Sequence, residues 1–177
     1  MNKFLFLLLF VPALLFGQQL RVDTSNSYIT YEASHPVHDW SGTSDAVQGV
    51  VIIENDIPNR MAIAAAVSSF NSKNSNRDSH ALEVLDALLF PKVSFYSEEM
   101  DLDKDSLSLN GELKFHGVSV PLETVASWTK VEDAYILEGE FNVQPSKFDI
   151  KLPSFMLVKM RDNMLVRFRL ELLTFVP

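Results

Sequence analysis

Hydrophobic and polar residues alternate along most of the chain after its first seventeen residues. Ile29, Tyr31 and Ala33 share one face of the first such segment, and residues 164–172 form the clearest one, apolar on one face and charged on the other. A period of two is typical of strands with one buried face. Further alternating runs lie at residues 47–53, 61–67, 93–95, 107–115, 122–128 and 135–143. The pattern predicts a protein built mainly from β-strands.

Short polar turns separate these runs, for example at residues 103–105, 116–117, 132–133 and 162–163. Strands at near-regular spacing with short connections favour an antiparallel sandwich or barrel over alternating strands and helices. About eight strands can close into a barrel whose interior is just wide enough for side chains or one slender ligand. We therefore expect an all-β fold, an antiparallel lipocalin-like β-barrel, in a single domain of residues 18–177.

One segment, residues 70–97, departs from the alternation. Its apolar residues recur at helical spacing, at Ala81, Leu82, Leu85, Leu88 and Leu89. Ser75 or Asn76 can cap the start, and Asp78 lies in the first turn, where a carboxylate meets the positive end of the helix dipole. Pro91 disfavours helical geometry at the residue before it. The sequence predicts one short helix between strands, over residues 76–89.

The first seventeen residues differ from the rest, with Lys3 followed by an apolar run from Phe4 to Phe16 and then Gly17. This run is shorter than the roughly 20 residues that a spanning helix needs, and its layout is typical of a secretory signal peptide. We expect cleavage near Gln18 and a periplasmic or secreted product without stable membrane insertion. The chain has no cysteine, so it cannot carry the acylated cysteine of a lipoprotein or form a disulfide.

The formal net charge is −8, and no run of lysine or arginine occurs. Nucleic acid and anionic membrane surfaces are both poor partners for a chain with this overall charge. No serine stands in a Gly-x-Ser-x-Gly motif, a thiol nucleophile is absent, and the six glycines form no phosphate loop. We expect a binding protein rather than an enzyme, with no cofactor.

Several short motifs occur in an order that resembles a known family. They are Met61 to Phe70 with Asn74, Arg77, Asp78 and His80; Leu85-Asp86; Phe90 to Phe95; Asn110 to Leu113 with His116-Gly117-Val118; Gly139-Glu140-Phe141; and Ser146 to Ile150. Their order and spacing, across residues 25–172, resemble the YceI-like family of periplasmic lipid- or polyisoprenoid-binding proteins. The segment from His35 to Trp40 departs from the family pattern. The resemblance implies a barrel that holds a long apolar chain, such as an isoprenoid quinone, a polyisoprenoid or a fatty-acid-like lipid, and leaves a homodimer possible.

Alternation places a set of large side chains on the inward faces of the strands. These are the candidate ligand-binding residues, Ile29, Tyr31, Ile63, Phe95, Leu113, Phe115, Phe141 and Phe168. Aromatic side chains on an inward face are more often core packing, and only the resemblance raises a cavity above that alternative. Two other functions stay open, a filled barrel that acts as a secreted interaction module and a small outer-membrane barrel.

Two polar clusters and one apolar loop remain. His35, His38 and Asp39 have a spacing that could hold a metal ion, but Pro36 and Gly42 place them in a predicted loop over the barrel mouth, and we expect no metal site. Asn74, Arg77, Asp78 and His80 are expected to organise the start of the helix, with Arg77 or His80 as the alternative contact for a ligand head group. The apolar loop Lys151 to Arg161 either forms a binding surface or folds back over one end of the barrel.

Overall fold

The computed structural model describes residues 18–155 and 157–175. The predicted signal peptide, residues 1–17, lies outside this range. Within the described part of the chain, no helix is both long and apolar enough to cross a membrane.

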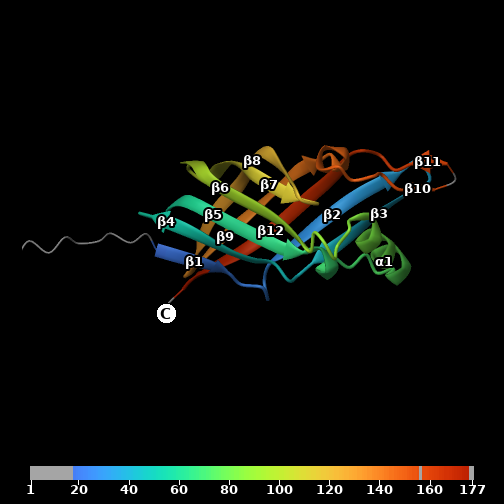
Figure 1. The fold of residues 1–177 in the computed structure, drawn as a ribbon. Coiled ribbons are helices and arrows are strands. Elements are labelled where there is room, and N and C mark those ends of the chain that lie inside the picture. Colours follow the sequence, from blue (N-terminus) through green and yellow to red (C-terminus); the bar gives the residue numbers. More distant parts are fainter. Residues whose placement is uncertain (1–17, 156, 176–177) are drawn as a thin grey trace, which may run out of the picture.

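Eight strands close into an antiparallel barrel (Figure 1), which confirms the predicted fold class. In order around the barrel they are β1 (Gln18–Val22), β4 (Gln48–Glu54), β5 (Ile57–Ala66), β6 (Lys92–Asp103), β7 (Ser106–Phe115), β8 (Val118–Val131), β9 (Ala134–Val143) and β12 (Met164–Thr174). Pairing of β12 with β1, with Leu20 opposite Thr174, closes the ring. Most of these strands coincide with the alternating runs of the sequence.

Two further strands form a hairpin that leaves the ring, β2 (Tyr28–His35) and β3 (His38–Ser44). β2 pairs with the first half of β12, and β1 pairs with its second half, so both lie along the same edge of β12. Thr43 of β3 makes an isolated bridge to Asn71. The short 3₁₀ helix η1 (Val67–Ser69) and the helix α1 (Ser75–Val84) lie beside this hairpin at one end of the barrel (Figure 1).

The predicted helix exists, but both of its predicted ends are wrong. The cap is Asn74, whose side-chain oxygen accepts a hydrogen bond from the backbone N–H of Arg77. The helix ends at Val84, and Asp86 then adopts a positive φ of 44°. Leu88 and Leu89 therefore lie in the following turn and are exposed, instead of continuing the apolar face. The leucine spacing extended the predicted helix past the point where the backbone reverses.

The barrel interior is divided along its length. The end that carries the turns β4–β5, β6–β7 and β8–β9, which we call the closed end, is filled by side chains with almost no exposed surface, including Leu20, Leu107 and Leu172. Trp128 stacks on Tyr135 there, with 5.0 Å between ring centroids. At the opposite end, which we call the open end, a smaller buried cluster that includes Val143, Phe148 and Ile150 is surrounded by apolar residues that are only partly buried. This end lies beside α1 and contains η2 (Pro145–Phe148), β10 (Ser154–Phe155) and β11 (Val158–Lys159).

The outer face of the barrel is charged. Arg167 pairs with Glu32 and Glu140 on the two strands that flank β12, and Arg169 pairs with Glu138 at 3.0 Å. Because these side chains alternate along β12 with buried ones such as Val166 and Leu170, each strand presents its apolar face inward and its charged face outward.

Candidate ligand-binding cavity

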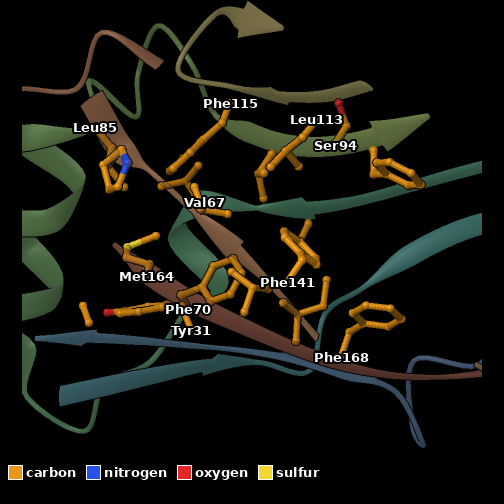
Figure 2. Close-up of a pocket in the computed structure, with 18 of the residues that line it drawn as sticks. Tyr31, Val67, Phe70, Leu85, Ser94, Leu113, Phe115, Phe141, Met164 and Phe168 are labelled. Atoms are coloured by element: carbon orange, nitrogen blue, oxygen red, sulfur yellow. The ribbon is translucent and has the colours of Figure 1, made fainter. Parts of the chain in front are cut away.

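A cavity of about 270 Å³ occupies the open half of the barrel. Its walls come from the barrel strands, from the β2–β3 hairpin and from α1, and they are almost entirely apolar. Figure 2 shows Leu113 and Phe115 on one side, facing Tyr31, Phe70 and Met164 on the other, with Phe141 between them. An engineered apolar cavity of about 150 Å³ is large enough to stay dry and bind benzene. This cavity therefore suits an apolar guest better than water.

The structure brings all eight sequence-predicted residues to this cavity. Its lining includes Ile29, Tyr31, Ile63, Phe95, Leu113, Phe115, Phe141 and Phe168. They come from six strands, and closure of the barrel brings their side chains to the same cavity. Their contact with a ligand remains a prediction.

The floor of the cavity meets the filled closed end. Leu109, Leu137 and Leu170 line the cavity and also belong to the tightly packed core. Phe168 lies close to this floor, with its ring centroid 6.2 Å from that of Phe141. An apolar chain that enters the cavity is thus stopped by packed leucines and does not pass through the barrel.

Ser94 of β6 and Thr124 of β8 line the cavity, and the other side chains with polar groups in the lining come from α1 and the β2–β3 hairpin. The Arg77 guanidinium lies 5.8 Å from the centre of the Trp40 ring, within cation–π range. Burial, followed by the negative charge of Asp78, raises the Tyr31 pKa above its ordinary value. At neutral pH Tyr31 is therefore an uncharged phenol, and Arg77 and its neighbour His80 are the basic groups of the lining.

Arg77 and His80 of α1 were named from the sequence as possible ligand contacts, but the apolar residues of this helix were not. Ala81, Val84 and Leu85 line the cavity together with Arg77 and His80, so the helix closes one side of it. The expected structural role of the polar cluster is also present, because the Asp78 carboxylate accepts hydrogen bonds from the backbone N–H and the hydroxyl of Ser72. The apolar spacing of residues 81–85 was the signal for this helix face, but periodicity alone does not say whether it meets a core or a cavity.

The predicted loop at His35, His38 and Asp39 is wrong, because these residues lie on the β2–β3 hairpin, with only Pro36 and Val37 at its turn. Nε2 of His35 donates to the Val158 carbonyl at 2.8 Å, and its Nδ1 accepts from the Val37 N–H at 3.2 Å. This pattern requires the neutral ring. Among the described residues, no group of three or more His, Asp or Glu side chains is arranged to hold a metal ion.

The segment Lys151 to Arg161 combines the two alternatives that the sequence left open. Its base folds over the barrel, where Met160 is buried and lines the cavity together with Pro153. Its middle forms the small β10–β11 hairpin, which projects from the open end (Figure 1) and exposes Leu157 and Val158.

Solved structures with a similar fold include three bacterial proteins. BcnA from Burkholderia cenocepacia is 14% identical, with a TM-score of 0.77 over 85% of this chain and 98% of that chain. A polyisoprenoid binding domain from Saccharophagus degradans is 9% identical, with a TM-score of 0.72 over 90% of this chain and 99% of that chain. The YceI protein of Campylobacter jejuni is 18% identical, with a TM-score of 0.61 over 73% of this chain and 82% of that chain.

Sequence comparison covers the same region. The family model described as the YceI-like domain matches residues 20–172. Among curated proteins, no sequence matches the chain.

Proposed function

The chain belongs to the YceI-like family, and from this premise we propose that it is an exported carrier that encloses a long apolar chain in its barrel cavity. The observation that carries the proposal is the cavity of about 270 Å³ beneath α1, lined almost only by aliphatic and aromatic side chains. The Saccharophagus degradans neighbour is described as a polyisoprenoid binding domain. A polyisoprenoid, an isoprenoid quinone or a fatty-acid-like lipid is the class of ligand that such walls accept.

Binding would be driven by transfer of hydrocarbon from water into the barrel. Each buried CH₂ group contributes about 0.8 kcal/mol before the costs of association are counted. Because packed leucines close the floor, the apolar tail would point toward Leu137 and Leu170, and the polar head would stay near Arg77 and His80. The lining offers no nucleophile paired with a base, which favours sequestration over catalysis.

Two alternatives from the sequence are less well supported. A filled barrel that serves only as an interaction module has no use for an apolar void in its interior. A barrel embedded in lipid presents an apolar band outward, whereas the outer face here carries the ion pairs of Arg167 and Arg169. The charged exterior supports a carrier that works in water. Export remains part of the proposal, and N-terminal sequencing of the mature protein should find a start near Gln18.

The proposal is tested by filling the cavity from the helix side. Ala81 of α1 lines the cavity, so Ala81→Trp should place an indole in the space that the ligand needs, and affinity for a fluorescent long-chain fatty acid should fall by about tenfold or more. Ser79 is exposed on the same helix, and Ser79→Trp is the matched control that should bind as the parent does. Equal affinity of the two variants, or no binding by the parent to any long-chain lipid, would contradict the proposal.

A further inference from the structure

The open end of the barrel exposes apolar side chains on two adjacent hairpins. Val37 in the β2–β3 turn is 64% exposed, and Leu157 and Val158 of the β10–β11 hairpin are 100% and 44% exposed. We call these three residues the hairpin tips. The two hairpins are joined, because His35 donates to the Val158 carbonyl and the Arg161 N–H donates to the Ser34 carbonyl at 2.9 Å.

The backbone conformation at position 157 is unfavourable for leucine. Leu157 adopts a positive φ of 67°, a conformation in which a bulky side chain is a genuine outlier. Turns at the closed end meet the same demand with polar residues, Asn55, Asp56, Lys104 and Glu132, and short hairpins ordinarily use Gly, Asn or Asp there. Neither the turn geometry nor packing against the described residues accounts for a leucine at this position.

The β10–β11 hairpin adjoins the cavity at its base. Pro153 and Met160 flank the β10–β11 hairpin at its base, are joined by a 3.0 Å backbone hydrogen bond, and line the cavity. Figure 1 shows this hairpin projecting from the end opposite to β1 and the C-terminus. A surface that bound the hairpin tips would therefore lie close to the residues that line this part of the cavity.

Charge is distributed unequally between the two ends of the barrel. The segment that connects β9 to β12, residues 144–163, carries Lys147, Lys151, Lys159 and Arg161 against Asp149 and Asp162. The adjacent β2–β3 hairpin adds Asp39 and Glu32, which pairs with Arg167, and α1 with the turn after it adds Asp78, Glu83 and Asp86 against Arg77. The β6–β7 turn at the closed end is acidic, with Glu98, Glu99, Asp101, Asp103 and Asp105 against Lys104. An anionic surface would thus attract the connection with the tips and repel the opposite end.

We propose that the hairpin tips dock the open end of the barrel on an anionic lipid bilayer, so that an apolar chain can pass between membrane and cavity. The inference rests on the proposed function, since an apolar chain resides in a bilayer before and after transport. Exposed apolar side chains would enter the boundary between headgroups and acyl chains while Lys151 and Lys159 meet anionic headgroups. The docking is peripheral and reversible, and the strands stay outside the membrane.

Vesicle sedimentation tests the docking with the chain from Gln18 onward, which contains every strand of the barrel. The parent should bind vesicles that contain about a third phosphatidylglycerol more strongly than pure phosphatidylcholine vesicles, and added salt should weaken the binding. Leu157→Asp should lower the affinity by about tenfold or more. Leu157 does not line the cavity, so this variant should still bind a fluorescent fatty acid in vesicle-free buffer. Val131→Asp is the control, because Val131 is also an aliphatic residue and is 51% exposed, but it lies at the closed end.

The two proposals fail in different ways. Equal vesicle binding by Leu157→Asp and the parent, or no vesicle binding by the parent, would overturn the docking surface even if fatty acid binds in solution. Vesicle binding that Leu157→Asp loses and Val131→Asp keeps would support it. A parent that docks on vesicles but takes up no apolar chain would support the docking surface and overturn the carrier function. Loss of binding in both variants would show that the tips are not the site and would overturn the inference.

Discussion

Two phenylalanines at the open end have different surroundings: Phe141 faces the cavity, and Phe148 is packed in the core. Phe141 lines the cavity and is only partly buried, whereas Phe148 is 2% exposed and does not line it. Phe148 packs on Phe115, with 5.7 Å between ring centroids. Removing a ring from a full core costs dispersion contacts on every side, whereas a ring beside a void has already lost some of them.

Truncating these two side chains should therefore give different results. Phe148→Ala should lower the free energy of unfolding by about 3–5 kcal/mol, and Phe141→Ala by less than about 3 kcal/mol. Phe141→Ala should also change the affinity for a long-chain lipid, because it enlarges the cavity. Urea unfolding and a lipid titration of both variants check this. Equal destabilisation with unchanged lipid affinity would indicate that Phe141 is ordinary core.

Asp56 gives a residue-scale prediction at the closed end. Its carboxylate accepts hydrogen bonds from the Tyr135 hydroxyl and from Lys130, and these bonds, the one from Tyr135 first, lower the Asp56 pKa below its ordinary value. A lowered folded-state pKa stabilises the protein above the pKa of the unfolded chain, and this contribution disappears as the pH falls through the folded-state value. The melting temperature of Asp56→Asn should thus lie below that of the parent near pH 7, and the gap should narrow below about pH 4. A gap that is constant across this range would contradict the assignment.

At the scale of elements, α1 forms one side of the cavity and is held mainly by its first turn. Asn74→Ala removes the side-chain cap on the Arg77 N–H and should cost about 1 kcal/mol. We expect faster hydrogen exchange in the α1 amides and faster release of a bound lipid. Ser75→Ala is the control, since Ser75 is the first helical residue and does not cap. Similar exchange rates in the two variants would show that the cap does not hold the helix.

The barrel was predictable because closure needs little more than alternation and short turns. Alternation in the long strands, such as Met164 to Leu172, identifies the buried face without any knowledge of partners, and this same face supplied the eight cavity residues. Sequence periodicity failed where local geometry decides. The leucines after Val84 fit a helical repeat, yet the positive φ of Asp86 ends the helix, and Gly42 suggested a loop where β3 forms.

The cavity itself could not be predicted from the residues alone. An inward phenylalanine looks the same in sequence whether it meets another side chain or empty space, since that depends on how far apart the walls stand. Here the β2–β3 hairpin continues the wall along the open half of β12, and α1 closes another side, so the space at that end is enclosed by elements that do not all pair as strands. The distance between opposite walls depends on the whole barrel, and only the family resemblance predicted a cavity.

At the scale of the whole molecule, the barrel is a packed half joined to a hollow half. The packed half, with Leu20, Leu107 and Leu172 fully buried, supplies stability that does not depend on a ligand. The hollow half holds the cavity, the helix and the exposed hairpin tips.

The central claim is that the hollow half encloses a long apolar chain. Native mass spectrometry of protein that is gently extracted from its source, followed by release and identification of bound lipid, tests it most directly. We predict a mass above that of the polypeptide by one lipid with a long hydrocarbon chain, and loss of that lipid in Ala81→Trp. Protein that carries no lipid on extraction, and takes none up when offered isoprenoid or fatty-acid chains, would contradict the account.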